Sequence, residues 1–404
     1  MLASKQIESL FLEEESYPSL IKYMGSKSKI MGFVMEGINE VYRGGAICDL
    51  FSGSASLSGA IGQQCLVHSN DIQNYSSVLA NTYNLAYLES GVPTSTELIE
   101  QAQIIVKKHK KSLGINISYD QKFSIEKFNE YEEIQRNILN KQFKRDWHLF
   151  VKNYSGTWWS AEQCLWIDAI REVAEQYKNK PYYPVILSSL MFAMAYSSQG
   201  TGHYAQFRDA KTESSFSDIL IYRKRSIVAY FGRKYNEIVE WLPTYKPTFK
   251  HKFTALDFKS CLDKFQGGLV YADPPYCFVH YSRFYHALET LVLYDYPTLQ
   301  VQKGKVVKGR YREERHQSPF CIKTKVKGAF EDLFLGIKNS NSALVMSYSN
   351  TGMISINEVE SIAARIFKNR KIDILKTDHK HMTLGRQKDR HRNVKECLFL
   401  VSQE

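Results

Sequence analysis

The chain has 404 residues, 44% of them hydrophobic and 24% charged, which is ordinary for a soluble protein of one large or two fused domains. No apolar stretch of 18 residues occurs, and the first 16 residues carry four acidic side chains. We therefore expect no membrane span, no signal peptide and a cytoplasmic protein. The formal net charge of +11 fits a nucleic-acid partner, because basic proteins bind phosphate backbones, although many basic proteins bind none.

The seven cysteines are scattered along the chain and include no CxxC pair. The histidines include no HExxH motif. These spacings argue against a disulfide framework, a structural zinc site and metal catalysis. We expect reduced thiols and no metal.

The first half of the chain begins with alternating strands and helices. Residues 1–20 read as an N-terminal arm or a short helix, and a glycine-serine turn then leads into a further helix. The apolar run Ala46–Leu50 predicts a strand, followed by a turn rich in glycine and serine and by a helix. Residues 65–84 repeat this scheme, with a strand that ends at Asp71. The alternation predicts a parallel, doubly wound sheet.

The middle of the chain has a different character. Long helical patterns cover Thr96–Lys111, Ser124–Phe143 and Ala161–Tyr177, and they are laced with lysine and aromatic residues. A second series of strand-like segments follows: HKFTALDF, GGLVYADPPY, ALVMSYSN and ECLFLVSQ. We therefore predict a sheet that is interrupted and resumed: residues 1–93 form its first half, residues 94–250 an inserted, mainly helical module, and residues 251–404 its second half.

Two features follow the first two predicted strands. In DLFSGSASLS (49–58), Gly53 permits a positive φ and a close approach to a ligand, and the next helix begins with unpaired N–H groups. A nucleotide-like cofactor commonly binds at such a turn, although the segment is not GxGxxG and a turn that binds nothing is the alternative. Asp71 ends the next strand, where an acid can accept hydrogen bonds from ribose hydroxyls or cap the following helix.

The segment VYADPPY (270–276) places an acid, two prolines and a tyrosine at the end of an apolar run. Proline has a fixed φ and no N–H, so the Asp273 carboxylate and the neighbouring carbonyls form a rigid cluster of acceptors. Such a cluster suits the exocyclic amino group of a base, because two acceptors draw its hydrogens away and direct its lone pair toward an electrophilic methyl group. Tyr276 offers a flat face to a base removed from its stack. The alternative is a strand that simply ends in a turn.

With these motifs in this order, the sequence resembles the S-adenosylmethionine-dependent DNA adenine-N6 methyltransferases, in the Dam-like branch with the α arrangement of motifs. The resemblance extends from about residue 23 to residue 399. It implies a Rossmann-like α/β fold with a mixed, mostly parallel seven-stranded sheet, helices on both faces and an inserted target-recognition module. It also implies a bacterial or phage-encoded enzyme of the restriction-modification or phage-defence type, and leaves open whether a cognate restriction endonuclease accompanies it.

The resemblance implies roles for individual residues. The catalytic tetrapeptide is Asp273, Pro274, Pro275 and Tyr276. The residues that bind S-adenosylmethionine are Lys22, Tyr23, Gly25, Asp49, Phe51, Gly53, Asp71, Ile72, Asp257 and Phe258. The sequence departs from the family pattern at Ala55, where a second glycine is usual.

The DNA-binding surface is predicted from basic and aromatic segments. SSQGTGHYAQFR (197–208) resembles a family segment that touches the target site, and its Tyr204 and Arg208 are candidates for DNA contact. YRKRSIVAYFGRK (222–234) interleaves basic and aromatic residues, so Arg223, Lys224 and Arg225 are candidates for contact with the phosphate backbone. The alternative for each basic segment is a solvated helix face or loop.

The sequence thus predicts a site-specific DNA methyltransferase that modifies the N6 amino group of a flipped adenine in duplex DNA. Two alternatives stay open: an enzyme acting on cytosine or on RNA, and a catalytically silent DNA-binding protein. The family usually places serine rather than aspartate before PPY in cytosine enzymes, and Asp273 therefore favours adenine.

Overall fold

The computed structural model of the protein describes residues 17–85, 91–114, 118–200, 202–242, 248–275, 278, 280–382 and 391–403. The predicted N-terminal arm or short helix lies mostly outside these residues. Within the described part of the chain, no helix is both long and apolar enough to cross a membrane.

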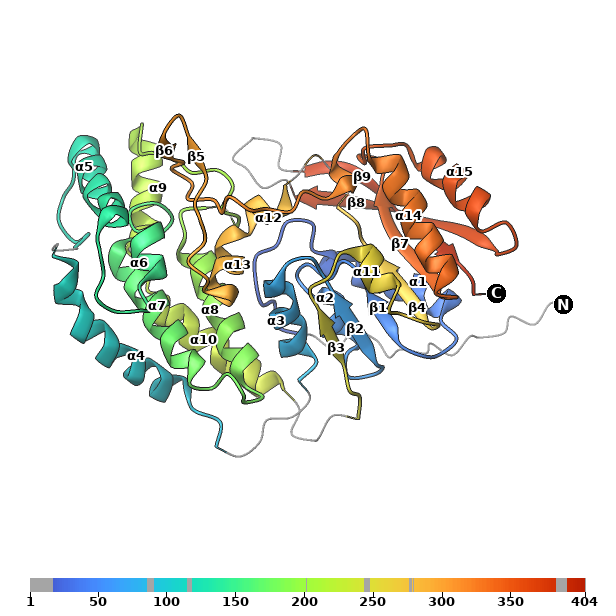
Figure 1. The fold of residues 1–404 in the computed structure, drawn as a ribbon, viewed down its shortest axis with the longest axis horizontal. Helices are drawn as coiled ribbons and strands as arrows, with labels where there is room; N and C mark the ends of the chain where they lie inside the picture. Colours follow the sequence, from blue (N-terminus) through green and yellow to red (C-terminus); the bar gives the residue numbers. More distant parts are fainter. Residues whose placement is uncertain are drawn as a thin grey trace.

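The core of the molecule is a mixed seven-stranded sheet with the strand order β3-β2-β1-β4-β7-β9-β8 (Figure 1). Strands β3, β2, β1, β4 and β7 are parallel to their neighbours, and β9 is antiparallel to both β7 and β8. This confirms the predicted fold class. The strands are β1 (Ile47–Asp49), β2 (Val67–Asn70), β3 (Lys252–Thr254), β4 (Leu269–Ala272), β7 (Ala343–Ser349), β8 (Ile372–Met382) and β9 (His391–Val401).

Helices cover both faces of the sheet because its central strands are apolar on both sides. On β4, Leu269 and Tyr271 face one core with helices α1 (Met31–Val41) and α2 (Ser56–Ile61). Val270 and Ala272 face the opposite core, which contains α11 (Phe258–Leu262), α14 (Val326–Asn339) and α15 (Ile356–Ile366). A run of buried residues with no polar alternation is what such a doubly covered strand requires.

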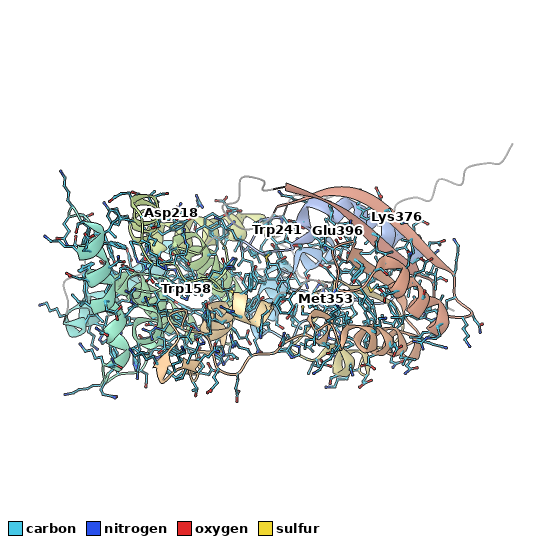
Figure 2. All side chains as sticks on the ribbon, turned by 90° about the horizontal axis from the view of Figure 1, so that it is seen from above. Trp158, Asp218, Trp241, Met353, Lys376 and Glu396 are labelled. Atoms are coloured by element: carbon cyan, nitrogen blue, oxygen red, sulfur yellow. The ribbon has the colours of Figure 1, made fainter. Side chains whose placement is uncertain are left out.

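The predicted helical module has a separate core. The helices of the module are α4 (Ser95–Lys110), α5 (Ile125–Arg136), α6 (Leu149–Tyr154), α7 (Ala161–Glu175), α8 (Tyr183–Ser197), α9 (Glu213–Arg223) and α10 (Ile227–Trp241). Two short 3-10 turns, η2 (Lys111–Leu113) and η3 (Asn137–Asn140), connect them. Helix α8 is buried along nearly its whole length and packs against α10. Figure 2 shows Trp158 and Asp218 in this helical part, and Met353 and Glu396 in the sheet part.

Part of the C-terminal third also packs on the helical module. Helix α13 (His286–Leu293) contributes Leu288 and Leu291 to the core of the module, and α3 (Asn74–Tyr83) lies against both α8 and α13. The hairpin of β5 (Val301–Gln302) and β6 (Lys305–Val306) lies on the same side of the molecule in Figure 1. The remaining short elements are η1 (Lys27–Ile30), α12 (Tyr281–Phe284) and η4 (Pro319–Cys321). The division into three segments stays a prediction, and this packing links the third segment to the second.

The strand order determines where a ligand can bind. From β1 the chain proceeds outward through β2 and β3, whereas β4 lies on the other side of β1. The order in which the chain adds strands to the sheet therefore reverses between β1 and β4, although the two strands are parallel. Crevices at the carboxyl ends of strands around such a switch point are the usual ligand sites of doubly wound sheets.

Candidate active site

A pocket opens at this switch point, with about 1140 Å³ of empty space that includes the solvent at its mouth. Its walls come from the segment that leads into η1, the turns that follow β1, β2 and β4, the start of α11, and the segments around α12 and η4. The lining includes Tyr23, Gly25, Asp49, Phe51, Gly53, Asp71, Ile72, Asp257, Phe258, Asp273, Pro274 and Pro275. The structure thus brings together most of the residues that the sequence analysis selected. Tyr276 lies outside the described residues.

The turn after β1 brings the backbone close to one wall of the pocket. Gly53 has φ +49°, and a Cβ atom at this position would lie 3.0 Å from the Tyr23 hydroxyl oxygen. Tyr23 in turn stacks on Tyr285, with ring centroids 4.5 Å apart and an interplanar angle of 13°. Ala55, where the family has glycine, also adopts a left-handed conformation, with φ 58°. A left-handed conformation at a residue with a side chain places backbone strain at Ala55.

Asp71 is bonded to the same turn. Its carboxylate accepts hydrogen bonds from Gly53 N and Gln73 N, both at 3.0 Å. Burial raises the pKa of Asp71 to about 6, against the opposing effect of these backbone hydrogen bonds. Asp71 does not cap the following helix: the N-cap of α3 is Gln73, and the first N–H groups of α3, at Asn74 and Tyr75, donate to Glu289. The sequence offered no signal for Glu289, which comes from α13.

Asp273 directly follows β4 and takes part in a buried ion cluster. Lys27 Nζ lies 3.3 Å from Asp273 Oδ1 and 3.5 Å from Glu396 Oε1. Lys27 is 6% exposed and Glu396 is 1% exposed. Burial by itself would lower the pKa of Lys27, but the charges of Asp273 and Glu396 more than reverse this effect and raise it. Burial, followed by the charges of Asp273 and Asp71, raises the pKa of Asp49 well above its ordinary value.

Lys27 and Glu396 were missed by sequence reasoning. Lys27 lies in the segment KYMGSKSK, two residues after Gly25, but the prediction selected the first lysine of that segment. The Nζ atom of this first lysine, Lys22, lies 4.1 Å above the ring of Tyr196 on α8. Glu396 is on β9, and the antiparallel pairing of that strand with β7 brings it to Lys27.

Several residues that were predicted to bind the cofactor form another part of the pocket wall. Phe51 lies in a tilted contact with Phe258, with ring centroids 5.9 Å apart. Asp257 is the N-cap of α11, and its carboxylate accepts a hydrogen bond from Lys259 N at 3.0 Å. Ile72 is 37% exposed. This part of the wall is apolar and aromatic and also carries the carboxylate of Asp257.

The predicted DNA-contacting residues differ in their accessibility. Tyr204 is 2% exposed, and its ring packs between Trp158 and Trp159. Arg208 forms an ion pair with Asp218 at 2.7 Å. Lys224 is exposed, and Arg225 is half-buried.

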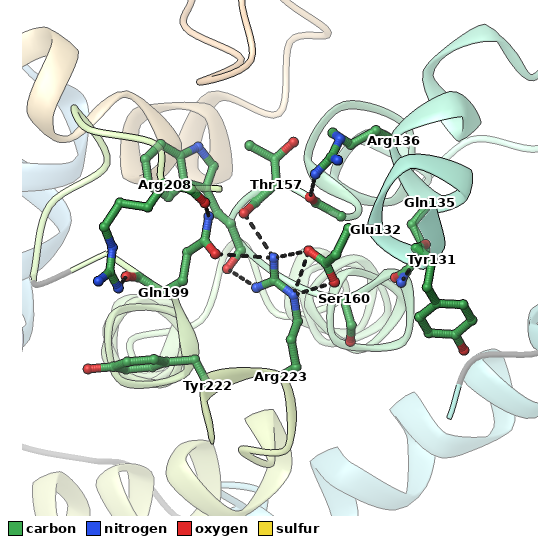
Figure 3. A network of polar contacts seen from close by, with 12 residues as sticks. Tyr131, Glu132, Gln135, Arg136, Thr157, Ser160, Gln199, Arg208, Tyr222 and Arg223 are labelled. Carbon is green, nitrogen blue, oxygen red and sulfur yellow. Dashed lines mark hydrogen bonds and ion pairs between the residues drawn. The ribbon is translucent and has the colours of Figure 1, made fainter. Parts of the chain in front are cut away.

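Arg223 is a core residue in the helical module (Figure 3). Its Nη2 lies 2.6 Å from Glu132 Oε2, and its guanidinium also donates to the carbonyls of Thr157 and Trp158. A buried charge whose donors are used inside the fold cannot reach DNA phosphates. The prediction that Tyr204 and Arg223 contact DNA is therefore not supported: one packs among tryptophans, and the other neutralises a buried carboxylate.

Three possible metal ligands meet within the described chain although they are scattered in the sequence. The ligand atoms of Cys48, His68 and Cys261 lie within 4.8 Å of one another, and the two sulfurs are 3.9 Å apart. His68 Nε2 also shares a hydrogen bond with Thr254 Oγ1 at 2.9 Å. Structural zinc sites have four protein ligands, and catalytic sites add a water molecule to three. This closed group of three residues fits neither pattern, so we assign no metal to it.

Comparison with known proteins identifies the family. Residues 23–362 match the family described as D12 class N6 adenine-specific DNA methyltransferase, and the chain belongs to that family. It is 24% identical over 358 residues to modification methylase LlaI of Lactococcus lactis subsp. lactis, an alignment that covers 85% of this chain and 49% of that protein. It is 26% identical over 360 residues to type II methyltransferase M.FokI of Planomicrobium okeanokoites, with 85% and 46% covered. It thus spans about half the length of these relatives.

A further relative has a similar length. Type II methyltransferase M.NlaIII of Neisseria lactamica is 21% identical over 386 residues, which cover 92% of this chain and 95% of that protein.

Proposed function

We propose that this protein transfers a methyl group from S-adenosylmethionine to the exocyclic N6 amino group of adenine in duplex DNA. The proposal rests on one observation. Asp273, Pro274 and Pro275, whose oxygen atoms can accept hydrogen bonds, line the same pocket as the acidic side chains of Asp49 and Asp71. Groups that could accept hydrogen bonds from an amino group and groups that could bind a nucleotide-like cofactor therefore line a single pocket. That arrangement suits a direct transfer between two bound molecules.

The charge of the pocket fits this methyl donor. Four acidic side chains (Asp49, Asp71, Asp257 and Asp273) and one ammonium group, that of Lys27, line it. Burial disfavours the ionised forms of Asp49 and Asp71 in the free protein, and a bound cation would favour them. S-adenosylmethionine has a sulfonium, an ammonium and a carboxylate, so it carries a net positive charge that such a pocket favours. When bound, it supplies an electrophilic methyl group.

The cofactor-side residues have roles that follow from their chemistry. The carboxylate of Asp71 can accept hydrogen bonds from ribose hydroxyls while it keeps its bonds to the turn after β1. The Phe258 ring and the Ile72 side chain offer apolar surface to a purine ring. The absence of a side chain at Gly53 lets the Tyr23 ring pack directly against this turn.

The target base requires a separate set of groups. The Asp273 carboxylate and a carbonyl of the proline step would accept the two hydrogens of the amino group, which aims its lone pair at the methyl group. Lys27 holds the Asp273 carboxylate from the other side, and Glu396 holds Lys27. The surplus proton of the amino group passes to water after the methyl group arrives. The stacking role of Tyr276 is proposed from the sequence.

The setting of the reaction is inferred from the relatives, which are named as modification methylases and type II methyltransferases. We infer that this enzyme also serves a restriction-modification system. DNA from cells that express it would then resist a restriction endonuclease that cuts the same site. DNA that stays cleavable by every such endonuclease would count against this setting.

The product of the reaction tests the proposal. The purified protein is incubated with S-adenosylmethionine and duplex DNA, and the DNA is digested to nucleosides and analysed by mass spectrometry. We expect N6-methyladenine. N4-methylcytosine, methylation of RNA alone, or no methylated nucleoside would each contradict the proposal, and the last result would favour a silent DNA-binding protein.

A further inference from the structure

Two arginines rest on one aromatic ring at the rim of the pocket. The Cζ atom of Arg283 lies 4.6 Å from the ring centroid of Tyr311, and that of Arg315 lies 5.7 Å from the same centroid. Tyr311 is 4% exposed, and its hydroxyl donates to the Ala205 carbonyl at 2.6 Å. The ring is therefore a fixed platform under two positive charges. Arg283 is exposed and Arg315 is half-buried.

The two charges are solvated by neutral groups of the protein. Among the described residues, neither Arg283 nor Arg315 forms an ion pair; Arg283 donates to the Ala205 carbonyl and the Tyr311 hydroxyl, and Arg315 donates to Gln300 Oε1. Nε of Arg315 is buried and has no hydrogen-bond partner in the described part of the protein. Burial, followed by the positive charge of Arg283, lowers the pKa of Arg315. Two like charges held together without a counterion raise the free energy of the free protein, and a bound anion would lower it.

The neighbouring arginine shows the contrast. Arg312 makes two hydrogen bonds to the carboxylate of Asp295, at 2.8 and 2.6 Å. Its charge is therefore neutralised within the fold. Glu313 and Glu314 lie between Arg312 and Arg315 in the sequence and are exposed, but neither pairs with Arg315 among the described contacts.

Each of the two arginines is adjacent in the chain to a residue that lines the proposed active site. Arg283 follows Ser282, and Arg315 precedes His316; both Ser282 and His316 line the pocket together with Asp273. The Ser282 hydroxyl donates a hydrogen bond to the His316 carbonyl, which ties the two segments together at the rim. The ring of His280 lies within hydrogen-bond distance of Ser282 Oγ, at 3.1 Å.

We propose that Arg283 and Arg315 bind a phosphodiester group of the DNA strand that carries the target base. The inference rests on the proposed function. A base that has left its stack remains attached to its own phosphates, so one of these must lie near the mouth of the pocket that receives the base. Guanidinium groups bind phosphate oxygens with paired N–H donors, and their positions on Tyr311 are already fixed before DNA arrives.

Binding measurements test the pair. We compare three variants, Arg283→Gln, Arg315→Gln and the double variant, with the control Arg365→Gln. Arg365 is an exposed arginine on α15 that forms an ion pair with Glu331 and does not line the pocket. The probe is a fluorescent duplex that contains a site methylated by the wild-type protein. We expect the double variant to bind about tenfold more weakly and to show a slope of log Kd against log salt that is smaller by about 1 for each phosphate that is no longer neutralised. The control variant should match the wild type.

A second measurement needs only the wild-type protein and the double variant. Neutral methylphosphonate linkages are placed in turn on either side of the target adenine. One of these positions should weaken wild-type binding by about tenfold. The same linkage should leave binding by the double variant almost unchanged, because this variant has no guanidinium groups at the rim to bind the phosphate.

The outcomes separate the two proposals. If the wild type methylates DNA but the arginine variants and methylphosphonate duplexes behave like their controls, the inference is wrong and the proposed function stands. The same holds if the variants lose affinity for S-adenosylmethionine, measured by calorimetry, and bind DNA normally, because the anion would then be the cofactor carboxylate. A wild type that methylates no DNA overturns both.

Discussion

Asp71 is partly exposed, and its ionised form is nevertheless disfavoured in the free protein. Burial raises the pKa of this carboxyl to about 6, whereas an aspartate in an unfolded chain has a pKa of about 3.9. Because the folded pKa is higher, the folded protein binds more protons than the unfolded chain between these two values. The contribution of Asp71 to stability is therefore largest at low pH and is lost as the pH rises through about 6.

The size of this effect follows from the two pKa values. Between pH 5 and pH 8 the shift from about 3.9 to about 6 removes about 1.4 kcal/mol of stability. Partial exposure of the carboxyl reduces this figure, so we expect about 1 kcal/mol. The variant Asp71→Asn has no titrating group here and lacks this contribution. On going from pH 5 to pH 8, the stability of the variant relative to wild type should thus improve by about 1 kcal/mol.

Urea unfolding of both proteins without cofactor, at pH 5 and at pH 8, measures this change directly. Calorimetry at pH 8 should also show that Asp71→Asn binds S-adenosylmethionine at least tenfold more weakly, since the amide offers one acceptor oxygen in place of two. An equal difference in unfolding free energy at both pH values would refute the assigned pKa. Unchanged cofactor affinity would refute the role of Asp71 in binding.

Three other substitutions test separate parts of the structure. Lys27→Met should lower the free energy of unfolding by about 3–5 kcal/mol, because it leaves buried carboxylates without their cation, and a loss below about 1 kcal/mol in urea unfolding would contradict this. Gly53→Ala should weaken cofactor binding in calorimetry, because the new methyl group would press against Tyr23 in the pocket wall. The control Gly32→Ala in α1, where a Cβ atom meets nothing within 4 Å, should bind the cofactor normally. Equal affinities in both variants would refute the importance of the close approach at Gly53. Arg223→Gln should destabilise the helical module by about 3–5 kcal/mol, since Arg223 neutralises the buried Glu132. The slope of log Kd against log salt for DNA binding should stay unchanged, and a smaller slope would support the predicted contact of Arg223 with DNA.

The sequence was informative where function depends on the ends of strands. Gly53, Asp71 and Asp273 each follow a short predicted strand, and the carboxyl ends of parallel strands lie along the same edge of a sheet. Local motifs therefore indicated the fold class and several of the segments that line the pocket. The chain order of the strand-like segments also indicated that the sheet is interrupted by helices.

The partners of the pocket residues could not be predicted in the same way. Glu396 reaches Lys27 through the pairing of β9 with β7, and no local pattern encodes that register. Arg223 lies in a basic segment that resembles a DNA-binding surface, but Glu132 on another helix draws it into the core. The pairing of a charge with a distant acid is a tertiary property, and a count of basic residues does not reveal it.

The central claim is that Asp273 acts on the target amino group and does not serve to bind the cofactor. The most direct measurement combines methyl transfer to duplex DNA with calorimetric titration of S-adenosylmethionine, for wild type and Asp273→Ala. The proposed mechanism predicts that transfer is abolished while the affinity for the cofactor largely survives. Equal loss of both, or transfer that persists in the variant, would contradict it.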